Sequence, residues 1–280
     1  MRKIENILAA VITLIFVTLG SYLAQSGATA PDLADGDLEI HFLNVGQGDA
    51  ILLEQQNEQV LIDGGPSDRV ISELGAVMPA TDKKIEKIIL THPHADHLRG
   101  LNYVMQYFEV EKVYFNGFAN DTPEFKQFLE IIRERSIPVE RLSAGSEVRS
   151  LDLTLSVLWP VAELEMTSDV NDTSLIMNGA FKSSRFLFPG DASIASQSAA
   201  RENLEQVDIL KVSHHGSRTG TNDELLAILN PRYAVVTVGK NSYGHPAATV
   251  LGLLRRSTIL RTDTEGTVSF RVNETGVLLY

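Results

Sequence analysis

The chain contains no cysteine among its 280 residues. Disulfide bonds, thiolate metal ligands, a cysteine nucleophile and a lipid-modified cysteine are therefore all excluded. Any metal ion must be held by histidine, aspartate, glutamate or backbone oxygen. A mixed set of imidazole and carboxylate ligands suits Zn²⁺ or Mn²⁺.

Basic residues are also scarce, with 24 lysines and arginines against 36 aspartates and glutamates. Without the three charged residues Arg2, Lys3 and Glu5, the net charge of residues 31–280 is −13. Such a field repels polyanions at long range, and binding through many phosphate contacts normally needs a basic face. The charge thus disfavours long nucleic acid as a ligand, although bound dications would offset several negative charges locally.

The sequence has no low-complexity tract and no long linker, which favours one domain, residues 31–280, after an N-terminal segment, residues 1–30. That segment has two basic residues, an apolar stretch over residues 7–24 and Ala-Thr-Ala at 28–30, the parts of a secretory signal peptide. The stretch also nearly reaches the ~20 residues that span a bilayer, so an uncleaved anchor stays open. Both alternatives place residues 31–280 outside the cytoplasm.

Residues 31–280 alternate short β-type runs with amphipathic helical patterns. Strands are predicted at 38–45, 50–54, 59–62, 87–90, 113–115, 153–158, 174–180, 185–188, 207–212 and 234–238, with a closing hairpin around Glu265-Gly266. Helices are predicted over 67–78, 98–107, 192–203, 222–229, 246–256 and from Pro123 onward. Mixed strands with helices outside them predict a layered α/β domain whose chemistry lies in the turns that follow strands.

The strongest functional signal is HPHADH at residues 92–97, directly after a predicted buried strand. Three imidazoles and a carboxylate on one turn can face two neighbouring metal ions, which lie ~3.5–4 Å apart in dinuclear sites. Surface histidines on a polar turn are the ordinary alternative. The motif, however, holds three of the seven histidines of the chain, so it predicts a metal site.

Other candidate ligands follow other apolar strands. Asp191 ends FLFPGD, His214 and His215 follow the strand 207–212, and His245 precedes Pro246. Alone, Pro-Gly-Asp is a common turn and His245 could serve a helix start. Six of the seven histidines nevertheless lie just beyond apolar strands, which predicts one shared site. His41 lies inside a predicted strand and is interpreted as structural.

These motifs resemble the metallo-β-lactamase superfamily, and more narrowly the metallo-β-lactamase-like domain of ComEC-type competence proteins in a free-standing form. The resemblance covers residues 38–271 and does not include the membrane channel of those proteins, so DNA transport is not implied. It implies an αββα sandwich and a metal-dependent hydrolase with two divalent ions, Zn²⁺ or Mn²⁺. The matching segments are FLNVGQGDAILLE (42–54), LIDGG (61–65), THPHADHLRG (91–100), NDTSLIM (171–177), FPGDA (188–192), LKVSHHGS (210–217), GHP (244–246) and RTDTEGTVSF (261–270).

One difference from most of the superfamily concerns the first metal. Those enzymes carry a histidine between the HxHxDH motif and the bridging aspartate, whereas residues 98–190 contain none. Either that metal is held more weakly or the His214-His215 turn supplies the ligand. The resemblance then implies one metal on His92, His94 and one histidine of this pair, a second on Asp96, His97 and His245, and Asp191 as the bridge.

Roles follow from this assignment. Because neighbouring side chains on an extended stretch diverge, we predict His215 as the ligand and His214, with Asp96, as catalytic. A water between the metals, its pKa lowered toward ~7, would attack the substrate while His214 donates a hydrogen bond or a proton. Ser217 and Asn241 are predicted substrate contacts, with ordinary turn roles as the alternative. Asp63 is predicted to support the ligands from behind, and for Gln47 and Asp49 a site role and a structural role stay open.

The predicted function is an exported phosphodiesterase or nuclease acting on a small phosphodiester or on extracellular DNA. An acyl-ester or lactone hydrolase is the alternative, because a fold does not fix the substrate. A non-catalytic metal-binding module is a third possibility. No protein partner is evident, and membrane contact is expected only through the N-terminal segment if it is uncleaved.

Overall fold

The structure is a computed structural model that describes residues 36–164 and 169–280. Residues 37–280 cluster as one unit. The predicted signal peptide or anchor, residues 1–30, lies outside the described residues. Within the described ranges, no helix combines the length and the apolar character that a membrane span requires.

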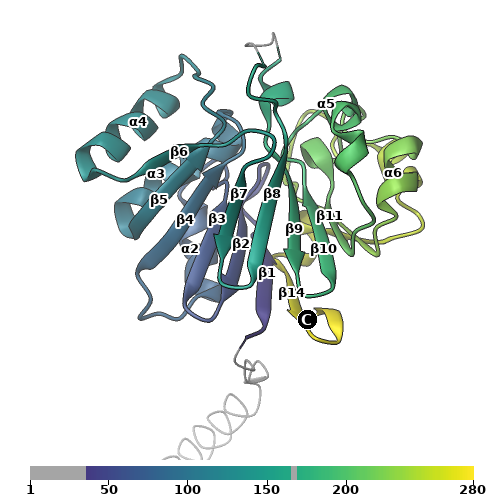
Figure 1. The fold of residues 1–280 in the computed structure, drawn as a ribbon, viewed down its shortest axis with the longest axis horizontal. Helices are drawn as coiled ribbons and strands as arrows, with labels where there is room; N and C mark the ends of the chain where they lie inside the picture. The colour runs from purple at the N-terminus through teal and green to yellow at the C-terminus, as the bar shows by residue number, and fades with distance from the viewer. Residues whose placement is uncertain (1–35, 165–168) are drawn as a thin grey trace, which may run out of the picture. The chain divides into compact units, whose positions relative to one another are not determined.

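Two β-sheets face each other, and helices cover the outer face of each (Figure 1). The first sheet has the order β15-β14-β1-β2-β3-β4-β5-β6 and the second β13-β12-β11-β10-β9-β8-β7. This arrangement confirms the predicted αββα sandwich. The strands of the first sheet are β1 (Leu38–Phe42), β2 (Ile51–Gln55), β3 (Glu58–Ile62), β4 (Lys84–Leu90), β5 (Glu109–Phe115), β6 (Val139–Arg141), β14 (Val268–Asn273) and β15 (Gly276–Leu279).

The second sheet comprises β7 (Glu147–Ser150), β8 (Leu153–Trp159), β9 (Ile176–Phe181), β10 (Ser184–Phe188), β11 (Ile209–Lys211), β12 (Tyr233–Val236) and β13 (Thr258–Arg261). Three longer helices follow strands of the first sheet: α2 (Arg69–Val77), α3 (Ala95–Tyr107) and α4 (Pro123–Arg135). The helices of the other half are α5 (Ile194–Ala199), α6 (Asp223–Leu229), α7 (Ala248–Leu253) and α8 (Thr262–Glu265).

Apolar side chains form three layers that follow from the alternation of strand residues. Leu53 and Phe186 point between the sheets and belong to the central cluster. The neighbouring residue Leu52 points outward and packs with α2, α3 and α4, while Leu187 packs in the outer cluster of the second sheet. Successive residues of a strand face opposite sides, so each sheet is apolar on both faces and both faces are covered.

The candidate ligand residues lie in loops that follow parallel strands. Strands β3 to β6 pair in parallel in the first sheet, and β10 to β13 do so in the second. The HPHADH motif follows β4, Asp191 follows β10, the histidine pair follows β11, and His245 comes after β12. Loops at the carboxyl ends of parallel strands converge, as the predicted strand-end histidines require.

Several element boundaries differ from the sequence prediction. The closing hairpin turns at Glu274-Thr275, between β14 and β15, because Gly266 instead ends the short helix α8. The edge strands β6 and β7 were not expected. All three residues of β6 lie at the surface and show no apolar alternation, and β7 is only four residues long. Strand β13 was also missed, although it pairs in parallel with β12.

Candidate metal centre

The HPHADH motif spans the junction between strand β4 and helix α3. His94 is the N-cap of α3, and the backbone N–H groups of His97 and Leu98 donate to its carbonyl at 3.1 and 2.9 Å. Asp96 and His97 therefore lie in the first turn of the helix, not on a preceding turn as expected from the sequence. A carboxylate is favourable at this position because helix N-termini carry partial positive charge.

The two buried histidines of the centre are each oriented through Nδ1. His97 Nδ1 lies 2.8 Å from Oδ2 of Asp63, and His215 Nδ1 lies 2.8 Å from the carbonyl oxygen of Thr237. An acceptor beside Nδ1 places the proton there and leaves the lone pair on Nε2. The Nε2 atoms of both histidines are buried and have no hydrogen-bond partner among the described residues.

Asp63 supports the centre from behind, as its position in LIDGG predicted. Its carboxylate accepts from the backbone N–H of Thr91 at 2.8 Å and from the Thr91 hydroxyl at 2.7 Å, in addition to His97. The same Thr91 hydroxyl lies 3.1 Å from Nδ1 of His92. Asp63 thus fixes the rings of two motif histidines, one directly and one through Thr91.

Four side chains converge in one group, here called the Asp-His cluster: Asp96, His97, Asp191 and His215. One ligand atom from each lies within 4.8 Å of all the others. Oδ2 of Asp191 is 3.3 Å from Nε2 of His97 and 3.3 Å from Nε2 of His215. Unpartnered buried imidazole nitrogens facing carboxylate oxygens form an arrangement that a bound cation would complete. The residues present therefore fit divalent metal ions.

His92 and His94 lie beside this cluster. Nε2 of His92 is 3.0 Å from Nδ1 of His94, and the rings of His92 and His97 have centroids 4.2 Å apart. Burial lowers the pKa of His92 well below its usual value, and the charge of His97 adds to the effect, so the His92 ring is neutral. A neutral imidazole can offer a lone pair to a metal.

The grouping of the predicted ligands differs from the expected one. We expected a histidine of the 214/215 pair beside His92 and His94, but Nε2 of His215 lies 3.4 Å from Oδ2 of Asp96. The expected partner of Asp96 and His97 was His245, whose ring instead packs 5.5 Å from that of His214. His215 thus lies beside Asp96, at the position that had been assigned to His245. The division of the ligands between two metals stays a prediction.

The cause lies in the backbone of the histidine pair. Strand β11 ends at Lys211, and His214 and His215 adopt left-handed conformations with φ of 50° and 52°. The pair is therefore not extended, contrary to the premise of the sequence argument. The side chains still diverge, because His215 is buried while His214 is partly exposed, with Nε2 3.8 Å from Oδ2 of Asp191. Non-glycine residues in this region are strained and cluster at functional sites.

Sequence reasoning missed Lys211, which is fully buried beneath the cluster. Its ammonium donates to the Gly190 carbonyl at 2.8 Å and to Oδ1 of Asp191 at 3.2 Å, and it pairs closely with Asp49. Asp49 in turn lies 3.3 Å from Nδ1 of His215, so its open assignment resolves to support from behind. The run VDILKV holds two charged residues, and nothing in the sequence marks this lysine as buried.

Electrostatics match this arrangement. Burial alone would raise the pKa of Asp191 and of Asp96, but neighbouring histidines outweigh it and hold both pKa values well below the usual range. Burial would lower the pKa of His97 and His215, but Asp191 and the carboxylates behind them raise it well above the usual value. The raised pKa thus favours a second proton on each ring, which a bound cation would displace.

A second convergence of acidic groups and histidine, at Asp49, Asp63 and His97, is a different case. The carboxylate of Asp49 is engaged by Lys211 and the Thr237 hydroxyl, and that of Asp63 by Thr91 and His97. Protein donors therefore already fill the oxygens that a metal would need. We assign this group to orienting the ligands.

A cavity of about 270 Å³ adjoins His245 and includes Ser217, Arg218 and Tyr243 in its walls. Ser217 thus borders this cavity, and its hydroxyl lies 3.0 Å from that of Thr219. The contacts of Asn241 match the ordinary turn role that was its alternative. Its amide donates to the carbonyls of Gly239 and His245, and its Oδ1 accepts two backbone N–H groups, so its bonds brace its own loop.

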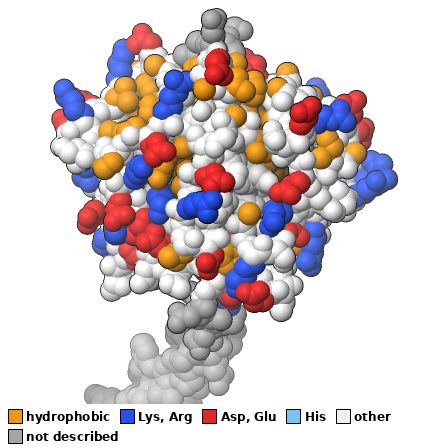
Figure 2. Space-filling model, in the orientation of Figure 1, with side chains coloured by type: hydrophobic (Ala, Val, Ile, Leu, Met, Phe, Trp, Pro, Cys, Tyr) orange, Lys and Arg blue, Asp and Glu red, His pale blue; other side chains and the backbone are white. Residues whose placement is uncertain are grey.

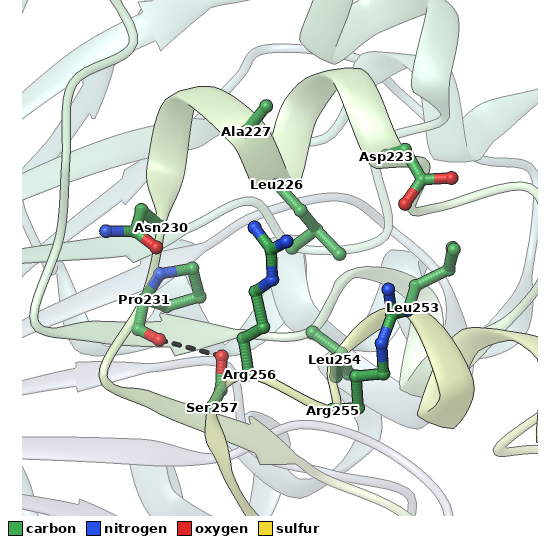
Figure 3. Close-up of a pocket in the computed structure, with 10 residues that line it drawn as sticks. All are labelled: Asp223, Leu226, Ala227, Asn230, Pro231, Leu253, Leu254, Arg255, Arg256 and Ser257. Carbon is green, nitrogen blue, oxygen red and sulfur yellow. Dashed lines mark hydrogen bonds between the residues drawn. The ribbon is translucent and has the colours of Figure 1, made fainter.

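Another cavity, of about 340 Å³, lies between α6 and the C-terminal end of α7 (Figure 3). Arg255 and Arg256 project into it, and Asp223 stands at its margin. None of the predicted site residues lines it. The chemistry of the chain is therefore better sought at the histidines than at this cavity.

The chain is similar to two longer curated proteins. ComE operon protein 3 of Bacillus subtilis (strain 168) is 29% identical over 257 residues, which cover 83% of this chain and 33% of that protein. Recombination protein 2 of Haemophilus influenzae is 29% identical over 244 residues, covering 84% of this chain and 29% of that protein. This chain therefore spans about a third of the length of these relatives.

Solved structures share the fold at low identity. The metallo-beta-lactamase fold protein YhfI from Bacillus subtilis aligns with a TM-score of 0.58 and 14% identity, covering 84% of this chain and 99% of that chain. The diiron beta-hydroxylase CmlA from Streptomyces venezuelae aligns with a TM-score of 0.56 and 14% identity, covering 85% of this chain and 55% of that chain. A diphosphatase of the PhnP family aligns with a TM-score of 0.51 and 17% identity, covering 84% of this chain and 98% of that chain.

The family assignment rests on a broader match. The model of the metallo-beta-lactamase superfamily matches residues 43–240, which include the HPHADH motif, Asp191 and the histidine pair. The match covers well over half of the chain, and the described cluster supplies the donors that the motifs predicted. The chain therefore belongs to the metallo-beta-lactamase superfamily.

Proposed function

We propose that this chain is an exported, metal-dependent hydrolase that cleaves phosphodiesters. The observation that carries the proposal is the Asp-His cluster, with two buried and unpartnered Nε2 atoms facing carboxylate oxygens. His92 and His94 would extend this donor set to a second ion. Two divalent ions, Zn²⁺ or Mn²⁺, supply Lewis acidity and an activated water when bound at such a site.

His214 is the residue best placed to act on the substrate. Its Nε2 lies 3.8 Å from Oδ2 of Asp191 and its ring 5.5 Å from that of His245, and the residue is partly exposed, whereas His215 is buried. Burial lowers the pKa of His214 below its usual value despite the nearby Asp191 carboxylate. A neutral ring at pH 7 donates a hydrogen bond and stabilises charge developing on a substrate oxygen. Of the two roles left open by the sequence, hydrogen-bond donation therefore fits better than proton donation.

The cavity beside His245 supports a phosphodiester over a lactone or simple ester. Arg218 is exposed in its wall, and no carboxylate of the described residues lies within ion-pair distance of its guanidinium. A free guanidinium suits a phosphate oxygen, whereas a lactone carries no charge for it to bind. Tyr243, 74% exposed, offers an aromatic face in the same wall. The diphosphatase with the same fold acts on phosphate bonds by its name and adds support.

The proposed substrate is small. Basic side chains are scattered among acidic ones on the face shown in Figure 2, and the chain has a net charge of −12. Long DNA would be held mainly through phosphate contacts and would need a basic surface. The names of two curated relatives, Recombination protein 2 and Competence protein ComA of Neisseria gonorrhoeae, refer to recombination and competence, so DNA remains the second substrate to assay. Export is supported by the signal-like pattern of residues 1–30.

The purified chain should be loaded with Mn²⁺ or Zn²⁺ and assayed on bis-p-nitrophenyl phosphate, plasmid DNA and a lactone panel. We expect turnover of the phosphodiester that a chelator abolishes and added metal restores. Arg218→Ala should raise KM for the phosphodiester, while the exposed Arg255→Ala, in the unrelated cavity, should not.

Lactone turnover without phosphodiester turnover would replace the proposal by the acyl hydrolase alternative. Stoichiometric metal with no turnover of any substrate would favour a binding module. An equal response of KM to the two arginine variants would remove Arg218 from the proposed substrate site.

A further inference from the structure

Lys211 stands out because the proposed chemistry does not use it and yet it is fully buried at the metal centre. A lysine is almost never buried unless it is paired. The side chain comes from strand β11, directly before the turn that carries His214 and His215. Its environment therefore needs an explanation beyond packing.

All three ammonium protons of Lys211 have acceptors. They are the carbonyl oxygen of Gly190 at 2.8 Å, Oδ1 of Asp191 at 3.2 Å and the carboxylate of Asp49 in close contact. An ammonium has three donors and no acceptor, so these contacts saturate it. No donor of Lys211 is left for water or substrate, which excludes direct action on a reacting group.

The contact with Asp191 separates the two oxygens of that carboxylate. Oδ1 of Asp191 accepts a hydrogen bond from Lys211, whereas Oδ2 lies 3.3 Å from Nε2 of both His97 and His215. With Oδ1 engaged, Asp191 presents a single oxygen to the centre. Rotation of the carboxylate would break the bond to a buried cation and is therefore costly.

The contact with Asp49 reaches a second ligand. Asp49 accepts the hydroxyl of Thr237 and lies 3.3 Å from Nδ1 of His215, whose proton points to the Thr237 carbonyl at 2.8 Å. Lys211 is thus tied to Asp191 directly and to His215 through Asp49. Groups behind metal ligands fix ligand orientation in this way.

We infer that Lys211 is a positioning residue of the metal centre, which holds Asp191 in a one-oxygen presentation and couples it to His215 through Asp49. The inference rests on the metal-dependent function proposed above but not on its substrate. The competing explanation is that Lys211 only balances two buried carboxylates so that the chain can fold. The two explanations predict different metal affinities for a variant in which the lysine and one of the carboxylates are removed together.

The test compares Lys211→Met with the double variant Lys211→Met/Asp49→Asn, which removes one buried cation and one buried carboxylate together. Asparagine keeps an oxygen for the Thr237 hydroxyl. Lys87→Met is the matched control. Lys87 is a partly buried lysine that lies away from the metal centre, and its Nζ is 3.1 Å from Oε2 of Glu58. Binding of Mn²⁺ and of Zn²⁺ is measured by calorimetry, and folding of each metal-free variant by circular dichroism and thermal unfolding.

We expect both Lys211 variants to bind metal about 10- to 100-fold more weakly than the wild type, as for other residues behind metal ligands. The double variant should regain thermal stability but not metal affinity, and Lys87→Met should bind metal normally. Recovery of wild-type affinity in the double variant would overturn the inference in favour of charge balance. Unchanged affinity in Lys211→Met would overturn it as well.

If Lys211→Met does not fold, the double variant decides the question alone. Metal affinity is measured without substrate, so a failure of the phosphodiesterase proposal leaves this test valid. Conversely, normal metal binding by both variants would reject the role of Lys211 while leaving the phosphodiesterase proposal untouched.

Discussion

Two neighbouring histidines lie in different environments because one turn of backbone directs their rings apart. His215 is 1% exposed and belongs to the Asp-His cluster, while the His214 side chain is 25% exposed and its ring lies 5.5 Å from that of His245. Both residues adopt φ near 50°, a conformation that costs of order 1–3 kcal/mol for a non-glycine residue. The strain is maintained by the contacts of the two rings and by the structure around them.

The first prediction separates the pair. His215→Ala should lose tightly bound metal, because it removes an Nε2 that faces two carboxylates. His214→Ala should keep metal but lower kcat by about 100-fold or more, the typical cost of one lost charge-stabilising donor. Metal content after dialysis and steady-state kinetics check both outcomes, with His41→Gln as the control histidine far from the centre. The reverse result would exchange the two roles.

The sequence could identify most residues of the centre but not their arrangement. The HPHADH motif and Asp191 were predictable because ligand-type residues follow apolar strands. Lys211 was not, since one lysine in an apolar run has no chemical signature until its acceptors are known. The position of His215 beside Asp96 depends on a left-handed turn that an alternating pattern does not predict.

At the scale of elements, helix α3 carries Asp96 and His97 and is seated on the loop that carries Asp63. Gly100 of the helix donates its N–H to the carbonyl of Gly65 at 2.9 Å. A Cβ on Gly100 would lie 1.7 Å from the carbonyl oxygen of Gly64. The backbones meet so closely that glycine is required there, and this contact sets the distance between the motif and its supporting carboxylate.

The second prediction compares two helical glycines. Gly100→Ala should destabilise the chain by about 1–3 kcal/mol or more through overpacking, and should weaken metal binding by displacing α3. Gly75→Ala in α2 has open space around its new Cβ and should stabilise by about 0.4–1 kcal/mol. Urea unfolding of the metal-free variants measures both. Equal effects of the two substitutions would show that the close approach of α3 is not rigid.

Strands and helices were predicted correctly where apolar residues recur at a regular spacing, and they were missed where this spacing is weak. Strands β4 and β5 and helix α4 lie where apolar runs or helical spacing indicated them. The exposed strand β6 has no apolar face to reveal it, and Glu265-Gly266 looked like a hairpin turn although it ends a helix. Such positions are decided by pairing with distant segments, which local residues do not encode.

At the scale of the whole molecule, protons and metal ions compete for one centre. Burial opposes charge on His97 and His215, but the surrounding carboxylates raise the pKa of both above the usual value. A raised pKa in the folded state stabilises the metal-free fold below pH ~6.5, and this contribution is lost as pH rises through the raised pKa. Metal binding displaces the same protons and therefore strengthens over that interval.

The third prediction follows from these opposite slopes. The rise in Tm on adding Mn²⁺ or Zn²⁺, relative to the chelated protein, should be larger at pH 8.5 than at pH 6.5. When free metal is 100-fold above Kd, bound metal adds about 2.7 kcal/mol to the free energy of unfolding. Thermal unfolding with and without chelator at the two pH values measures it. His215→Ala should reduce the dependence on pH. A metal effect that is equal or greater at pH 6.5 would contradict the assignment of protons to these rings.

The origin of the cluster in two sheets has a consequence for how the chain acquires its structure. Asp96 and His97 follow β4 of the first sheet, whereas Asp191 and His215 follow β10 and β11 of the second. Neither half alone contains the full donor set, so the centre can form only after the sheets have packed together. Capture of metal by all four donors therefore requires the two halves of the sandwich to be docked.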